Sequence, residues 1–252
     1  MKILRSSLFF IALSLLGCES RPAPPTTTPA SRAPLVVVDP NTAGSITGVI
    51  RFQGAIYKVP TLDMSQDPAC PPERQPSDAF VMKDGALANV FVYVKDGLPQ
   101  GRFAPPSEPV VLDQKGCRYS PHVMGIMAGQ QFKVLNSDFA QHNVHPMPAN
   151  NSQWNETQMP MGQPIIKTFA HPEMMVPIQC NQHPWMRAYL SVMSHPYFAV
   201  SAADGSFTIK NLPPGEYTIA AVHERFGEQT MKVKVGPKAT ATAQFIFAQG
   251  QL

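Results

Sequence analysis

The sequence predicts an all-β protein made of two β-sandwiches. Short runs of β-branched and aromatic residues recur along the chain, and clusters of Gly, Pro, Asn and Asp separate them. The 252 residues include 27 prolines, which interrupt helices. No window keeps a helical period of 3.6 for more than about ten residues. The length is sufficient for two domains of ordinary size.

The first residues have the pattern of an export signal. A basic start, with Lys2 and Arg5, precedes an apolar run over residues 8–16 that is too short to span a bilayer as a helix. The sequence Leu-Leu-Gly-Cys that ends at Cys18 resembles the lipobox of bacterial lipoproteins. This resemblance implies a signal peptide over residues 1–17 and lipidation of the Cys18 thiol. An ordinary signal peptide is the alternative.

Residues 18–43 are rich in Pro, Thr, Ser and Ala and contain little that could be buried, which predicts a disordered tether. Without Lys2 and Arg5 the net charge of +3 falls to about +1, which gives no electrostatic reason to expect a nucleic-acid partner. We therefore expect an exported protein held by lipid on a bacterial membrane, at the periplasmic face of the outer membrane or at the cell surface.

Strand-like runs follow one another from Gly44 onward. The first two are Ile46 to Phe52 and Ala88 to Val94, each closed by a turn that contains Gly. Further runs lie at residues 109–112, 131–135, 165–169, 176–179, 188–193, 206–209, 216–222, 230–235 and 241–247. Residues 60–79 and 146–164 have the composition of long loops.

The four cysteines differ in their surroundings. Cys18 belongs to the lipobox, and Cys180 lies in a motif with other metal-binding side chains. Cys70 and Cys117 remain, and a leftover pair in an oxidising compartment predicts a disulfide. The competing interpretation, in which one of them is a metal ligand, is weaker because neither has His or Met at ligand spacing in the same loop.

The heptapeptide from Cys180 to Met186 places a thiolate, an imidazole and a thioether in one loop between two strand-like runs. Thiolate and thioether suit Cu(I), and imidazole suits both Cu(I) and Cu(II), so this set is typical of a copper ion that transfers electrons. A fourth ligand must come from another strand end. His142 follows the run at residues 131–135 and is placed for this role.

This ligand set has two alternatives. His145 could replace His142, but on a strand it would share the face of Asn143 and lie opposite His142, so we expect His142 to be the ligand. Zinc could bind similar side chains, although a structural zinc site more usually has paired cysteines or a carboxylate in place of Met.

Two motifs resemble those of cupredoxins, the small blue-copper proteins, and most closely the amicyanin-like type. They are Asn-x-Asp-x-x-x-His-Asn-Val-His at residues 136–145 and Cys-x-x-His-Pro-x-Met at residues 180–186. The resemblance implies a Greek-key sandwich over residues 106–195 that holds one type 1 copper ion. It also implies that His142, Cys180 and His183 are the equatorial ligands and that Met186 is the axial ligand. Asn143 would join the two ligand loops by hydrogen bonds.

The C-terminal part has a second recognisable pattern. An Asp-Gly turn, an alternating strand, a Pro-Pro-Gly turn and another strand follow one another over residues 203–219. This pattern resembles the carboxypeptidase regulatory-like, transthyretin-type β-sandwich, and residues 44–50 look like its first strand. We therefore expect this sandwich to consist of residues 44–105 and 196–252, with the copper domain inserted. Two consecutive domains that divide near residue 196 are the alternative.

These features predict a one-electron carrier and not an enzyme, since His122 and His171 are too scattered to build further copper centres. The expected partners are extracytoplasmic redox proteins. The loops expected near the copper contain several methionines: Met147, Met159, Met161, Met174 and Met175. They are gap-filling or exposed side chains in the simplest interpretation. The two other interpretations are an apolar docking patch around an edge-exposed His183 and a Cu(I) relay. The alternative functions are a copper chaperone or store, and a copper-free interaction module.

Overall fold

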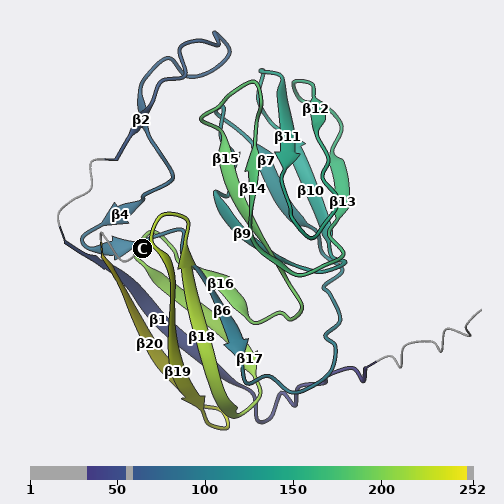
Figure 1. Ribbon diagram of the computed structural model, residues 1–252, viewed down its shortest axis with the longest axis vertical. Helices are drawn as coiled ribbons and strands as arrows, with labels where there is room; N and C mark the ends of the chain where they lie inside the picture. Colours follow the sequence, from purple (N-terminus) through teal and green to yellow (C-terminus); the bar gives the residue numbers. More distant parts are fainter. Residues whose placement is uncertain (1–32, 55–58, 249–252) are drawn as a thin grey trace, which may run out of the picture. The chain divides into compact units, whose positions relative to one another are not determined.

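The computed structural model describes residues 33–54 and 59–248 of the chain. Within these ranges every regular element is a β-strand, which confirms the all-β class (Figure 1). The expected signal peptide, the lipidation of Cys18 and most of the tether lie outside the described residues. None of the described residues belongs to a helix long and apolar enough to cross a membrane.

One sandwich is formed by strands from both ends of the described chain. Its first sheet has the order β17-β1-β5-β4, with β20 paired to β1, and its second sheet has the order β16-β6-β18-β19. The strands are β1 (Gly44–Gln53), β4 (Met82–Lys83), β5 (Ala86–Leu87), β6 (Phe91–Asp96), β16 (Phe198–Val200), β17 (Ser206–Leu212), β18 (Gly215–His223), β19 (Gly227–Val235) and β20 (Thr240–Ala248). We call it the outer sandwich.

The other sandwich is formed by residues 110–193 and is called the inner sandwich. Its sheets have the orders β13-β10-β7-β8 and β12-β11-β14-β15-β9. The strands are β7 (Val110–Gln114), β8 (Tyr119–Ser120), β9 (Val123–Met127), β10 (Gln131–Asn136), β11 (His142–Pro146), β12 (Glu156–Gln158), β13 (Ile165–Thr168), β14 (Glu173–Gln179) and β15 (Arg187–Met193). Strands before and after this segment share the sheets of the outer sandwich.

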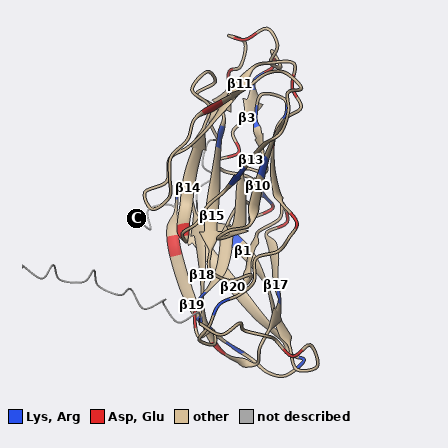
Figure 2. Cartoon of the chain, turned by 90° about the vertical axis from the view of Figure 1, so that its right-hand side faces the viewer, with Lys and Arg blue, Asp and Glu red and all other residues tan. Residues whose placement is uncertain are grey.

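Each sandwich has its own apolar core because buried and exposed side chains alternate along its strands. In β20, Ala243, Phe245 and Phe247 point inward while the residues between them are exposed. The outer core also contains Ile50 and Ile219. The inner core is built from side chains of both its sheets, among them Leu112, Phe132, Val144, Ile178 and Leu190. Basic and acidic residues are interspersed along the chain (Figure 2).

The register of β11 against β14 brings the two metal-binding motifs together. These strands are antiparallel, and His145 lies opposite Gln179. The start of β11 and the loop after β14 therefore meet at one end of the inner sandwich. His142 is the first residue of β11, and Cys180 directly follows β14.

Two loop predictions differ from the structure. The stretch predicted as a loop over residues 146–164 contains β12, which pairs with β11. The predicted loop over residues 60–79 contains two short strands, β2 (Thr61–Leu62) and β3 (Gln75–Pro76), which pair with each other. The predicted strand signal was weak in both places because polar residues and prolines dominate them. Residues 59–80 together are called the arm.

The end of the predicted tether is also attached to the folded chain. Leu35 forms a parallel bridge with Arg102, and the Val36 N–H donates to the Arg102 carbonyl over 2.9 Å. Val38 packs against the outer core. The tether predicted over residues 18–43 therefore included the β-branched segment Val36 to Val38, in which the Val36 N–H and the Val38 side chain find partners while the Val37 side chain is exposed.

Candidate metal centre

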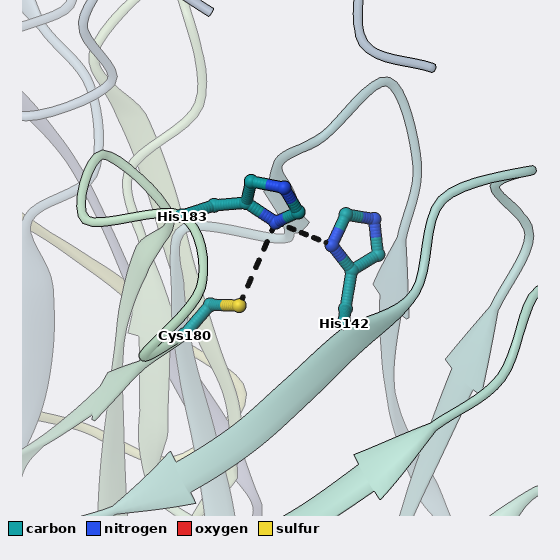
Figure 3. A group of neighbouring side chains, drawn as sticks. All are labelled: His142, Cys180 and His183. Carbon is teal, nitrogen blue, oxygen red and sulfur yellow. Dashed lines mark hydrogen bonds between the residues drawn. The ribbon is translucent and has the colours of Figure 1, made fainter. Parts of the chain in front are cut away.

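Three of the predicted ligands form one buried cluster. The imidazoles of His142 and His183 and the thiol of Cys180 have ligand atoms that all lie within 4.8 Å of one another (Figure 3). The two Nδ1 atoms are 2.8 Å apart, and the Cys180 Sγ lies 3.7 Å from the His183 Nδ1. Their exposed fractions are 0, 2 and 3% for His142, Cys180 and His183.

The loop between β14 and β15 fixes two of these groups. The Met186 N–H donates to the His183 carbonyl over 2.9 Å, and the Cys180 N–H donates to the Met186 carbonyl over 3.3 Å. These bonds close the loop into a tight turn that carries Cys180 and His183 on the same side. Met186, the predicted axial ligand, is buried in the same core cluster as Cys180.

Asn143 joins the two ligand segments, which is the role that the resemblance implies. Its side-chain Oδ1 accepts the Asn181 N–H over 2.7 Å, and its own backbone N–H points at the Cys180 Sγ over 3.5 Å. Its side-chain amide donates to Asn155 over 2.6 Å. These bonds hold the thiol at a fixed distance from β11.

Asp138 orients His142. Its Oδ2 accepts the His142 Nε2–H over 2.8 Å, which leaves the Nδ1 of this ring facing the cluster. The backbone N–H groups of Gly116 and Cys117 also donate to Asp138, over 2.6 and 2.8 Å. Both residues have positive φ, 63° and 54°, in the tight turn between β7 and β8, a conformation that aims successive N–H groups at one acceptor.

Asp67, in the arm, plays the same part for His183. Its Oδ2 accepts the His183 Nε2–H over 3.0 Å, and its Oδ1 accepts the Ala69 N–H over 2.8 Å. Neither Asp67 nor Asp138 was among the predicted site residues. The prediction that His183 is exposed at the edge was wrong. The arm covers its Nε2, and the centroid of the Trp185 ring lies 5.0 Å from that of the imidazole.

The arm is fastened to the inner sandwich at several points. Cys70 forms a disulfide with Cys117, with 5.6 Å between the Cα atoms. Met64 is fully buried in the inner core, and Asp78 pairs with Arg118 over 2.9 Å. A segment that lies between two strands of the outer sandwich thus completes a site in the inner one.

The charges of the cluster depend on one another. Burial lowers the pKa of His142, but hydrogen bonds with Asp138 and Cys180 raise it more, to about 9. Burial raises the pKa of Cys180, but His142 and nearby backbone N–H groups lower it to about 7. The cluster therefore favours a thiolate beside a positive charge, which a metal cation can supply in place of a proton.

The remaining candidates lie apart from the cluster. His145, the alternative ligand, contacts Asn181 through its Nδ1 over 3.3 Å. Among the loop methionines, Met159 and Met161 are 61 and 64% exposed. Both follow β12, and the carbonyl of Met159 accepts from Asn136. Their roles as relay or docking residues stay predictions.

The comparisons with known proteins find partial matches. The family model of the beta-sandwich domain of ER membrane protein complex subunit 7 matches residues 179–248. This range runs from the end of β14 to the end of β20 and so includes the last five strands of the outer sandwich. No curated protein sequence matches the chain.

Among solved structures, a copper-containing nitrite reductase from Thermus scotoductus SA-01 aligns at 19% identity and a TM-score of 0.33, over 40% of this chain and 26% of its own. This chain thus spans about a quarter of that enzyme. A purple cupredoxin from Nitrosopumilus maritimus aligns at 19% identity and a TM-score of 0.29, over 33% of this chain and 99% of its own. A variant of amicyanin in the reduced Cu(I) form aligns at 19% identity and a TM-score of 0.31, over 36% of this chain and 92% of its own.

Proposed function

We propose that this protein is a one-electron carrier that holds a single type 1 copper ion in the inner sandwich. The ligands would be His142, Cys180 and His183 around the ion and Met186 as the axial thioether. We also propose that the chain is exported and is anchored to a bacterial membrane through a lipid on Cys18. It makes and breaks no substrate bonds in this role.

The observation that carries the proposal is the arrangement of the two imidazole rings. Each Nε2–H is donated to a carboxylate, so both Nδ1 atoms point to one place beside the Cys180 sulfur, 2.8 Å from each other. Two nitrogens this close need a shared proton or a cation between them, and a metal ion can take the place of that proton. Histidines that bind metals commonly donate their other N–H to a carboxylate in this way.

The chemistry of the donors favours copper. A thiolate and a thioether are soft ligands that suit Cu(I), and two imidazoles suit both oxidation states. Copper supplies the electron chemistry, while the protein holds the ligands in place. The fixed loop between Cys180 and Met186 and the bonds of Asn143 limit how far the ligands move when the charge changes, which favours rapid electron transfer.

Export and membrane attachment would place this carrier where redox proteins exchange electrons outside the cytoplasm. The lipid would keep it close to a membrane, and we propose other extracytoplasmic redox proteins as its partners. The supporting observation is the signal-like N-terminus with its Leu-Leu-Gly-Cys ending.

Copper loading followed by visible spectroscopy and electrochemistry tests the proposal. We expect an intense visible absorption after addition of one equivalent of Cu(II), loss of colour on reduction, and full recovery on reoxidation. A colourless protein that binds Cu(I) tightly but shows no reversible one-electron couple would contradict the carrier function. That result would favour a copper chaperone or store, which the exposed Met159 and Met161 support. A chain with no copper affinity would instead act as an interaction module.

A further inference from the structure

The disulfide between Cys70 and Cys117 lies against the outer side of the metal centre. Ligand atoms of Cys70, Asp67 and His183 lie within 4.8 Å of one another, and so do ligand atoms of Cys117, Asp138 and His142. The two groups are joined because the cysteines share one S–S bond. Each imidazole therefore has ligand atoms near both the Cys180 sulfur and a disulfide sulfur.

The spacing of the two cysteines suits a shared metal ion once the bond is open. Their Cα atoms are 5.6 Å apart. In a tetrahedral site with metal–sulfur distances of about 2.3 Å, two thiolates lie about 3.8 Å apart, a separation that modest side-chain rotation allows here. The carboxylates of Asp67 and Asp138 lie beside these sulfurs and can complete the donor set.

We propose that reduction of the Cys70–Cys117 disulfide creates a second metal site, which binds a closed-shell cation such as Zn²⁺ or Cu⁺. This inference goes beyond the proposed function, since it concerns a different ion and different sulfurs. A dithiol reductant supplies two electrons and two protons: its two S–H bonds are replaced by one S–S bond, while the protein S–S bond becomes two S–H bonds. Binding of the cation then releases both thiol protons to solvent.

The surroundings favour attack at one particular sulfur. Cys70 is 5% exposed and Cys117 is fully buried, so the thiolate of the reductant would attack the Cys70 Sγ and release the Cys117 sulfur. The resulting mixed disulfide on Cys70 is resolved by the second thiol of the reductant.

The arm has other attachments that would hold the cysteines close after reduction. The Arg118 Nη1, next to Cys117 in the chain, donates to both carboxylate oxygens of Asp78 over 2.9 and 3.0 Å. Met64 remains a member of the inner core. The Trp185 Nε1–H donates to the Cys117 carbonyl over 3.0 Å and fixes the backbone of that residue. The second site is thus expected to form on a folded protein.

A Cd²⁺ titration of the full, metal-free chain tests the proposal. Cadmium is a closed-shell probe whose bonds to thiolates absorb in the ultraviolet, so both ions and thiolates can be counted. One sample stays oxidised, and the other is reduced with dithiothreitol that is then removed under nitrogen. We expect one bound ion and one thiolate in the oxidised sample, and two ions and three thiolates in the reduced sample.

Two variants separate this proposal from the proposed function. The Cys70→Ser/Cys117→Ser double variant should bind one ion whether or not it has been reduced. The Cys180→Ser variant should gain one ion with two thiolates on reduction, even if the copper site itself is wrongly assigned. Equal ion counts in the oxidised and reduced wild-type samples would overturn the proposal. Loss of the β-type circular dichroism on reduction would also overturn it, because the disulfide would then be needed for folding.

Discussion

Both sandwiches bury histidines, but the ring nitrogens have different hydrogen-bond partners in the two sandwiches. In the inner sandwich, the Nε2–H groups of His142 and His183 are donated to carboxylates, and their Nδ1 atoms face each other. In the outer sandwich, the Nδ1 of His195 accepts the Tyr197 N–H and the Nδ1 of His223 accepts the Arg225 N–H. The first pair is arranged to bind a cation, while the second pair uses its lone pairs within the fold.

The acid–base behaviour of the rings follows from these contacts. Burial lowers the pKa of His195 and of His223 to about 4, since no close carboxylate offsets the lost hydration strongly enough. His142 is as deeply buried, yet its pKa is raised to about 9 by Asp138 and Cys180. Burial alone therefore does not distinguish a ligand histidine from a core histidine.

His122 shows that a carboxylate partner is also insufficient. Its Nε2 forms a short contact with the Glu224 carboxylate, but its Nδ1 lies 2.9 Å from the carbonyl of Arg187. Both ring nitrogens thus face acceptors of the fold, and no cluster of three possible metal ligands among the described residues includes His122. The combination that marks a ligand is a carboxylate on one nitrogen and other ligand atoms at the second.

The strongest test of this comparison removes the only sulfur of the cluster that is free to ionise. In Cys180→Ala we expect the intense visible absorption of the copper-loaded protein to disappear, because it arises from the bond between thiolate and copper. Copper affinity should fall by more than about 100-fold, which exceeds the usual effect of losing an outer hydrogen-bond partner. Spectra and competition titrations with a chelator measure both effects.

The exposed His171 provides the matched control. His171→Gln should keep the absorption and the affinity of the wild-type protein. A blue absorption that persists in Cys180→Ala would exclude this cysteine as a copper ligand, and with it the proposed centre.

The next largest effect is expected from Asp138→Asn. The Asn carbonyl oxygen can still accept the N–H groups of the turn at Gly116 and Cys117. Its NH₂ group would then face the His142 Nε2 and place the ring proton on Nδ1, which blocks the ligand atom. We expect copper affinity to fall by about 100-fold, near the upper limit for such partners, measured by chelator competition.

A fall in affinity with unchanged circular dichroism would identify a tautomer effect. A variant that unfolds, or one that binds copper as tightly as the wild type, would contradict this role of Asp138.

The sequence predicted the local parts of this site and missed the distant ones. The spacing of Cys180, His183 and Met186 is a property of one short loop, and the position of His142 after the strand-like run at residues 131–135 made it the candidate for the fourth ligand. Asp67 is 116 residues before His183 and lies in a segment without periodicity, so no sequence pattern linked the two. Strand β11 was not among the predicted strand-like runs, although the choice between His142 and His145 assumed a strand there, since its His, Asn and Pro residues are poor indicators of a strand.

The predicted division of the chain rests on local signals of the same kind. The Asp-Gly and Pro-Pro-Gly turns near β17 and β18 are strong local signals, and the hydrophobic run of β1 resembles a strand of the same sandwich. The pairing of β1 with β20 is a contact between the two ends of the described chain. Only the resemblance to a known family, and no pattern within either strand, could suggest it.

The core histidine His223 predicts that the stability of the fold depends on pH. The pKa of His223 lies near 4 in the folded chain and near its ordinary value of 6.5 in the unfolded chain. Between these values the unfolded chain binds more protons, so the free energy of unfolding should fall as the pH is lowered. For this residue the loss is about 2 kcal/mol between pH 7 and pH 5.

Urea unfolding of the metal-free wild type and of His223→Asn measures this contribution. The Asn side chain keeps an acceptor for the Arg225 N–H but cannot take up a proton. The variant should therefore lose less stability on acidification, whatever its stability at pH 7. Parallel pH profiles for the two proteins would show that His223 does not titrate with a lowered pKa.

The smallest effect is expected from Asp67→Asn, which compares the two carboxylates directly. Asp67 holds His183 as Asp138 holds His142, but its side chain is 31% exposed against 11% for Asp138. Water can therefore replace part of the lost interaction, and we expect copper affinity to fall by only about tenfold. Asp63, on the same arm, pairs with Arg74 away from the cluster, so Asp63→Asn should bind copper like the wild type. A loss as large as that of Asp138→Asn would mean that the arm fixes His183 as firmly as the β7–β8 turn fixes His142. No loss at all would mean that the arm merely covers the site.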